Sequence, residues 1–183
     1  MASKYPIAST SRYPTHAQGL QSSSDLLQYW LAKEGIQPQW LPEYEQIAEW
    51  LADNKGKGLL LAGSCGRGKT LIATRILPIF INELGRVYSI YNSYDLNVRQ
   101  KDVFYSHLLC IDDLGIENES VQYGERRNVF VELMDLVEKK GKFIVVTTNL
   151  TQEQIEDKYG TRTIDRFYSC CEIVQFSGQS LRR

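Results

Sequence analysis

The strongest chemical signal in this chain is a glycine-rich octet that ends in a lysine and a threonine. Its residues are, in order, Gly63, Ser64, Cys65, Gly66, Arg67, Gly68, Lys69 and Thr70. Glycines at this spacing let backbone N–H groups turn toward an anion with no Cβ in the way, and a following helix adds partial positive charge. The octet therefore predicts a loop that binds nucleotide phosphates, with Lys69 on the β- and γ-phosphates and Thr70 on a magnesium ion.

The sequence on either side of the octet has the context that such a loop needs. Residues 58–62 are an apolar run typical of a buried parallel strand, and residues 71–73 open a helical pattern. A glycine-rich turn that binds nothing is the alternative. The order of strand, loop and helix favours a nucleotide.

Two adjacent carboxylates follow a second apolar run. Residues 108–111 lead directly into Asp112 and Asp113. We expect Asp112 to hold the magnesium ion through water and Asp113 to orient or deprotonate an attacking water, which suits hydrolysis. The alternative is a pair of acids that cap a helix after the strand.

Polar residues also follow the strand that we predict at residues 142–147. Thr147, Thr148 and Asn149 come at its carboxyl end, where ligands collect on parallel sheets. Asn149 could hydrogen-bond the attacking water or the γ-phosphate. An asparagine before a helix could equally serve as a cap alone.

Three arginines near the end of the chain are candidates for contacts with phosphate charge. Arg162 and Arg166 are four residues apart, so in a helix they share a face, and either could reach the nucleotide of a neighbouring subunit. An arginine supplied in this way is worth roughly 10³–10⁵ in rate. Arg182 is a further candidate for the γ-phosphate. Surface salt bridges and a solvated basic tail are the alternatives.

Strand and helix patterns alternate along the rest of the chain. We predict strands at residues 58–62, 86–91, 107–112, 142–147 and 172–176, and helices at 25–33, from Pro42, after the octet, at 127–139, from Thr151 and at 161–169. Pro78 is expected to kink the helix after the octet. The alternation predicts an α/β fold with a parallel sheet covered on both faces.

Composition and charge exclude several other classes of protein. With 183 residues, 43% of them hydrophobic and 23% charged, the chain suits one domain; we expect residues 1–24 to form a flexible or extended arm and residues 25–183 the domain. The net charge of −1 gives no global sign of nucleic acid binding, so any DNA contact would be local. No run approaches the roughly 18 apolar residues of a membrane span, and no signal peptide is apparent, which predicts a cytoplasmic protein.

The motifs in combination resemble those of one family. Besides the octet, they occupy residues 111–115, 125–127, 147–150, 159–167 and 178–182. The pattern over roughly residues 40–183 is similar to the AAA+ ATPases of bacterial helicase loaders of the DnaC/DnaI type and to the related IstB transposition helpers. The resemblance implies an AAA+ type P-loop NTPase fold with a five-stranded parallel sheet and a minimal or missing C-terminal lid. It also implies ATP and Mg²⁺ as cofactors, Asn149 as sensor 1, Arg162 as a trans arginine finger, Arg166 as its companion and Arg182 as sensor 2.

Two departures from the family limit what the resemblance carries over. The residues before the core are fewer than the helicase-binding module of loaders, which leaves a helicase-docking role open. Residues 92–106 link two predicted strands directly, where the family has longer helical elements that contact single-stranded DNA. Tyr94, Arg99, Lys101 and Tyr105 in this link are of types that stack on bases or bind phosphates, or they are ordinary surface.

Two classes of function remain open from the sequence. The first is a magnesium-dependent AAA+ ATPase that assembles with copies of itself through Arg162 and acts in DNA replication or with a mobile element. The second is a nucleotide-gated binding module for a replicative helicase or a transposase, with negligible hydrolysis. Asp113 supports the second class because its side chain is shorter than the commoner glutamate.

Overall fold

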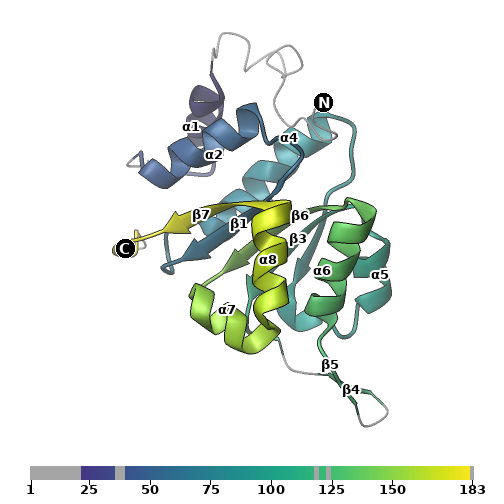
Figure 1. The fold of residues 1–183 in the computed structure, drawn as a ribbon. Coiled ribbons are helices and arrows are strands. Elements are labelled where there is room, and N and C mark those ends of the chain that lie inside the picture. The colour runs from purple at the N-terminus through teal and green to yellow at the C-terminus, as the bar shows by residue number, and fades with distance from the viewer. Residues whose placement is uncertain (1–21, 36–39, 118–119, 123–124, 182–183) are drawn as a thin grey trace.

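The computed structural model describes residues 22–35, 40–117, 120–122 and 125–181 (Figure 1). The first described helix, α1 (Ser23–Lys33), begins within the segment that we predicted as an arm, and Ser22 caps it through a capping box with Asp25. Residues 1–21 and Arg182 lie outside the described residues.

Five parallel strands form the central sheet. They are β1 (Gly58–Gly63), β2 (Ser89–Asn92), β3 (Leu108–Leu114), β6 (Phe143–Thr148) and β7 (Cys171–Phe176). Their order across the sheet is β2-β3-β6-β1-β7, and every neighbouring pair is parallel. This confirms the predicted five-stranded sheet, in which β1, β3 and β6 are buried because helices cover both faces.

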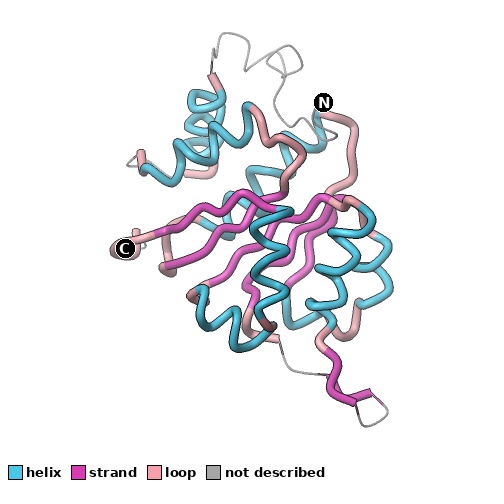
Figure 2. Tube along the Cα trace, in the orientation of Figure 1, coloured by secondary structure: helices cyan, strands magenta, loops and turns pink. Residues whose placement is uncertain are grey.

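The helices divide into two layers, one on each face of the sheet (Figure 2). The first layer consists of α1, α2 (Pro42–Ala52), α3 (Lys69–Leu71), the π-helical segment η3 (Ile72–Ile76) and α4 (Leu77–Glu83). The second consists of α5 (Gln100–Tyr105), α6 (Val129–Lys140), α7 (Gln152–Tyr159) and α8 (Thr161–Cys170). Each layer closes its own hydrophobic core.

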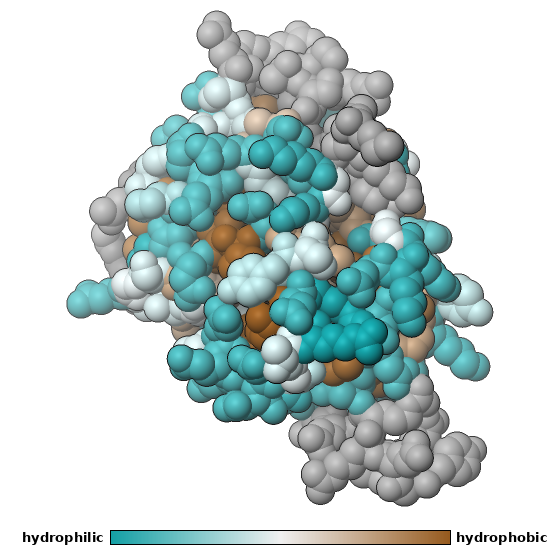
Figure 3. Space-filling model, viewed as in Figure 1, coloured by the Kyte–Doolittle hydropathy of each residue, from teal (hydrophilic) through white to brown (hydrophobic). Residues whose placement is uncertain are grey.

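Successive side chains of β1 point alternately into the two hydrophobic cores. Leu59 and Leu61 point into the core under α2 and α4, whereas Leu60 and Ala62 point into the core under α6 to α8. The visible surface over the second layer is mostly hydrophilic, and apolar colour appears there only in small separate areas, some of them beside α8 (Figure 3). The apolar residues of the layer are therefore turned toward the sheet.

The helix after the glycine-rich octet is irregular just before Pro78, where we predicted a kink. Pro78 has no N–H group, so it cannot close a regular helical bond to Thr74. The chain instead widens to a π-turn, in which the Leu77 N–H group bonds to the carbonyl of Ile72.

Two segments differ from the predicted elements. The strand expected at residues 86–91 begins only at Ser89, and Val87 is 80% exposed beside this edge of the sheet. The direct link expected at residues 92–106 contains a short 3₁₀ turn, η4 (Ser93–Asp95), and α5. Lys142, which is distant from α5 in the sequence, donates hydrogen bonds to the carbonyls of Phe104 and Ser106 at the end of this helix.

A small hairpin between β3 and α6 was not predicted. It pairs β4 (Ser120–Gln122) with β5 (Glu125–Arg127) in antiparallel register. Three-residue strands are too short to give a periodic signal. Among the described helices, none combines the length and the apolar content needed to cross a membrane.

Candidate nucleotide-binding site

A cavity of about 520 Å³ lies at the carboxyl ends of β1, β3 and β6. Its lining residues come from the glycine-rich loop, the helices after and before it, two strand ends and the chain after β7. They are Tyr44, Cys65, Gly66, Gly68, Lys69, Thr70, Leu71, Thr74, Arg75, Asp113, Asn149 and Leu181. The cavity therefore brings together three motifs that are separated by up to about 80 residues in the sequence, as the Lys69–Asn149 contact illustrates.

The backbone of the loop requires its glycines. Gly66 has φ +77° and Gly68 has φ +93°, a region that L side chains rarely adopt. A Cβ atom at Gly66 would lie 2.1 Å from the Ser180 hydroxyl, and one at Gly68 would lie 3.0 Å from the Tyr44 hydroxyl. The loop is thus a tight cradle of backbone groups at the start of α3, which is the form that the octet predicted.

Lys69 lies at the centre of the site. Its side chain is buried, and its Nζ donates to the carbonyls of Gly63 at 2.7 Å and Ser64 at 2.8 Å. A third hydrogen bond, of 2.8 Å, reaches Oδ1 of Asn149 at the end of β6. Lys69 and Asn149, which the sequence predicted for one site, are therefore in direct contact.

A β-bulge presents the two acids differently. The pairing of β3 with β6 shifts register between Ile111 and Leu114, and Asp113 has φ +54°. Such a bulge re-aims side chains that simple alternation would place on opposite faces. As a result Asp113 lines the cavity, whereas Asp112 is buried at the same strand end.

Thr147, on β6, forms hydrogen bonds with both acids. Its hydroxyl donates to Oδ1 of Asp112 at 2.6 Å and accepts from the Asp113 N–H group at 2.9 Å. The Ser93 hydroxyl also donates to the Asp113 carbonyl. The sequence placed Thr147 near the ligand, but its part in orienting the acids depends on a contact across strands.

The side chain of Arg67 points away from the cavity, although Arg67 was predicted as a nucleotide-binding residue. It is buried and forms a 3.0 Å ion pair with Glu43 of α2. Burial on its own would raise the pKa of Glu43, but hydrogen bonds from its own backbone N–H group and from Ser177, together with Arg67, hold it below its ordinary value. In this arrangement the backbone of Arg67 belongs to the loop, while its side chain is directed to α2.

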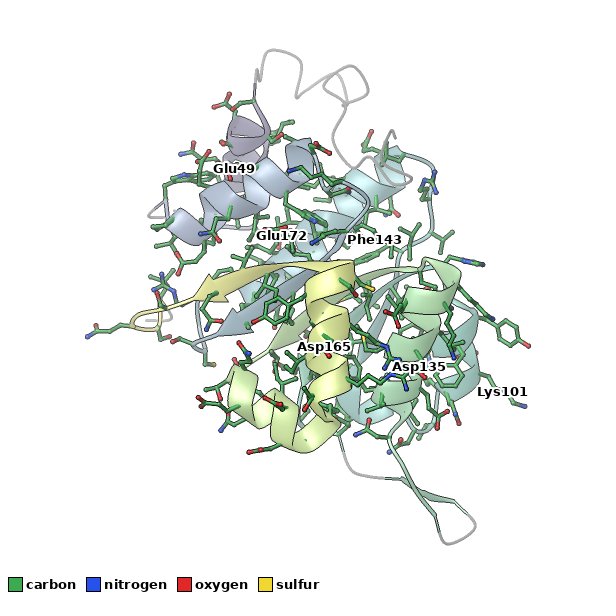
Figure 4. The ribbon with its side chains drawn as sticks, in the orientation of Figure 1. Glu49, Lys101, Asp135, Phe143, Asp165 and Glu172 are labelled. Carbon is green, nitrogen blue, oxygen red and sulfur yellow. The ribbon has the colours of Figure 1, made fainter. Side chains whose placement is uncertain are left out.

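The two arginines of α8 have different surroundings. Arg162 is exposed at the start of the helix and is not among the residues that line the cavity of its own chain. Arg166, by contrast, is 2% exposed and pairs with Asp135 at 2.5 Å and Glu138 at 3.0 Å, both on α6. Asp135 is labelled beside α8 in Figure 4. The expectation that Arg166 reaches outward is not met, because α6 supplies two carboxylates that hold it inside.

The sequence missed five residues of the cavity wall. They are Tyr44, Leu71, Thr74, Arg75 and Leu181. Tyr44 lies in the core on α2, in the helix that we predicted from Pro42, and its hydroxyl donates to the Arg67 carbonyl at 3.2 Å. A hydroxyl on an otherwise apolar helix face was the only local signal.

Comparison with known proteins was made at the level of sequence and of structure. No protein-family model and no curated protein matches the sequence. The crystal structure of the DnaC helicase loader superposes with a TM-score of 0.60 at 23% identity, over 82% of this chain and 99% of that one. The chain has the fold of the DnaC helicase loader. The resemblance that the motifs predicted is thereby confirmed for the fold.

Two further solved structures share this DnaC-like fold. DnaI matches with a TM-score of 0.52 at 21% identity, over 69% of this chain and 73% of that one. AMPPCP-bound DnaA from Aquifex aeolicus matches with a TM-score of 0.55 at 19% identity, over 73% of this chain and 45% of that one. The three structures share with this chain the α/β fold described above.

Proposed function

We propose that this protein is a magnesium-dependent ATPase of the AAA+ type. The observation that carries the proposal is the convergence of Lys69, Asp113 and Asn149 on one cavity beside the phosphate loop. These are the residue types needed to bind a triphosphate, to accept a proton from water and to orient that water. The DnaA structure with the same fold was solved with AMPPCP, an ATP analogue, which supports the choice of nucleotide.

The residues present fit ATP and a magnesium ion. The loop has no room for a side chain at Gly66, where a Cβ atom would collide with Ser180, and Lys69 supplies a buried cation beside it. Thr70 and Asp112 would hold the ion, since a hydroxyl and a carboxylate are ligands that Mg²⁺ accepts. The ion would supply charge neutralisation on the phosphates.

The chain's own groups have separate tasks in this proposal. Lys69 binds the phosphates through its ammonium group, which carries three donors. All three have protein acceptors, so a phosphate oxygen must replace at least one of them, and the exposed Asn149 is the easiest to release. Released in this way, Asn149 can orient a water toward Asp113, which takes its proton.

Arg162 completes the site from a second copy of the chain in this proposal. Its exposure and its absence from the cavity lining of its own chain favour a contact in trans. We further propose that the assembled protein acts in DNA replication as a helicase-loader-like factor, or with a mobile element. The partner would be a replicative helicase or a transposase, and the structural similarity to the DnaC helicase loader supports the first.

ATP turnover at increasing protein concentration tests the trans arrangement. Turnover per molecule should rise with concentration in the wild type. Arg162→Ala should lose this rise and roughly 10³-fold or more in rate, while ATP binding stays nearly intact. Asp165→Asn, an exposed change on the same helix, is the matched control and should behave as wild type (Figure 4). Turnover that does not depend on concentration would contradict the proposal.

A nucleotide-gated binding module is the second candidate function. The observation in its favour is the fixed backbone of Asp113, whose N–H and carbonyl groups are both bonded to other strands or turns, so its short carboxylate has little freedom to approach a water. If this candidate is correct, ATP changes partner affinity equally in wild type and Asp113→Asn. A partner response that disappears in Asp113→Asn would instead support the ATPase.

Single-stranded DNA is proposed as a weak additional ligand of the segment between β2 and β3. Tyr94 and Tyr105 are 60% and 81% exposed, and Arg99 and Lys101 are exposed beside them. Binding measured at low and at high salt tests this, because phosphate contacts weaken steeply with salt. No binding at low salt would remove DNA as a direct ligand.

A further inference from the structure

Arg67 connects the phosphate loop to two other parts of the chain. Its Nη2 group donates to Oε1 of Glu43 in α2 at 3.0 Å, and its Nη1 group donates to the carbonyl of Gln179, after β7, at 3.1 Å. The planar guanidinium can make both bonds at once because its donors point in fixed, divergent directions. A lysine ammonium lacks this fork.

Residues 177–181, which we call the tail, also make backbone hydrogen bonds beside the one from the guanidinium. The Leu181 N–H group donates to the Gly66 carbonyl at 2.9 Å, and the Ser64 N–H group donates to the carbonyl of Phe176, just before the tail, at 2.9 Å. The Ser177 N–H group donates to the same Glu43 oxygen that accepts from Arg67, at 3.0 Å. The tail thus lies along the loop, and Leu181 lines the cavity.

The burial of the pair points to a role in positioning. Glu43 is 4% exposed and Arg67 is 8% exposed. Taking two charges out of water costs free energy that the ion pair often does not recover, so a buried pair is weak evidence for stability. What it does fix is geometry, and a loop with glycines at positive φ has little rigidity of its own.

We propose that Arg67, held by Glu43, is a positioning residue of the nucleotide site, which fixes the phosphate loop against α2 and holds the tail as a wall of the cavity. The inference rests on the proposed nucleotide binding. It adds that affinity for the nucleotide depends on a side chain that points away from it. The pair makes no hydrogen bond to Asp113 or Asn149, the residues proposed to accept the proton and to orient the water.

Binding of fluorescent ATP and ADP analogues to Arg67→Ala, Arg67→Lys and Glu43→Gln measures the effect. We expect Kd to rise about tenfold or more in both Arg67 variants, as the loss of charged hydrogen bonds would give. KM for ATP should rise with it, while kcat at saturating ATP stays near the wild-type value. Glu49→Gln, an exposed change on the same helix, is the control and should leave Kd unchanged.

Hydrogen exchange separates positioning from overall stability. In Arg67→Lys, which keeps a charge beside Glu43, amides of the tail should exchange faster while those of β1 and β6 keep their protection. Equal loss of protection throughout the sheet would overturn the proposal, since the pair would then serve stability alone. Unchanged Kd in folded Arg67 variants would overturn it as well. If the wild-type protein binds no nucleotide, the proposed function is overturned instead. Hydrogen exchange of the tail amides would still show in that case whether Arg67 positions the tail.

Discussion

At the scale of single residues, the orientation of the two acids depends on Thr147. Its hydroxyl is buried, donates to Asp112 and accepts from the Asp113 N–H group. Thr147→Val keeps the shape but removes the acceptor of the half-buried Asp113 N–H group and one donor to the buried Asp112 carboxylate. We expect it to lower the free energy of unfolding by about 1–3 kcal/mol, measured by urea denaturation, and to lower kcat for ATP more than it changes KM.

Thr163→Val is the matched control for this change. Thr163 is equally buried, but its hydroxyl donates to a carbonyl one helical turn earlier, that of Tyr159, and not to an acid at the site. Its loss should cost less stability and leave kcat unchanged. Equal effects on kcat from both variants would show that Thr147 has no special connection with the acids.

The same scale separates the residues that the sequence could predict from those that it could not. The loop, the acid pair and Asn149 were predicted because each is signalled by its immediate neighbours. The sequence offered Arg166 as a contact to a neighbouring subunit and could not show that it is buried, because its partners, Asp135 and Glu138, belong to α6. The pairing of Arg67 with Glu43 was missed for the same reason: spacing within a motif carries no information about contacts with a distant helix.

At the scale of elements, the turn after β3 is fastened to the end of α7. Glu117, which is buried, accepts from the Gly115 N–H group at 2.8 Å and from the Tyr159 hydroxyl, while Lys158 donates to the Gly115 carbonyl at 2.6 Å. Burial and the bond to Glu117 raise the pKa of Tyr159 far above its ordinary value, so the hydroxyl keeps its proton and remains a donor. The strand end that carries the acids is thereby linked to the turn that precedes Arg162.

Tyr159→Phe tests this link between elements. It removes the donor to a buried carboxylate and should cost about 1–3 kcal/mol of unfolding free energy. Because α8 starts two residues later, we also expect the rise of turnover with protein concentration to weaken. Tyr168→Phe is the control, since that tyrosine is 52% exposed and its hydroxyl donates to the exposed Gln152. Loss of stability with an unchanged rise would contradict the link.

The sequence predicted the order of the elements better than their ends. Apolar runs predicted all five strands of the main sheet. The signal was clearest for β1, β3 and β6, because a strand buried on both faces must be apolar throughout. The sequence missed α5 and the hairpin of β4 and β5, which are too short for a periodic pattern. Tertiary contacts, such as those of Lys142 with the end of α5, decide whether segments of this length are ordered.

At the scale of the whole molecule, the buried carboxylate of Glu43 joins the first helical layer to the loop and to the chain after the last strand. Its pKa is lowered from the ordinary 4.5, so the folded state binds its proton less readily than the unfolded state does. The stabilisation that it contributes is therefore complete above about pH 4.5 and is lost as the pH falls through the lower, folded value.

Glu43→Gln should accordingly flatten the acid side of the stability profile. At pH values under about 4.5, the urea midpoint of the wild type should decrease with falling pH more steeply than that of the variant. Between about pH 4.5 and neutral pH, the midpoints of the two proteins should change with pH in the same way. Glu49→Gln, exposed on the same helix, should keep the steep wild-type fall. If Glu43→Gln keeps it too, the carboxylate does not join the three parts in the way that the geometry indicates, and other acids govern acid unfolding.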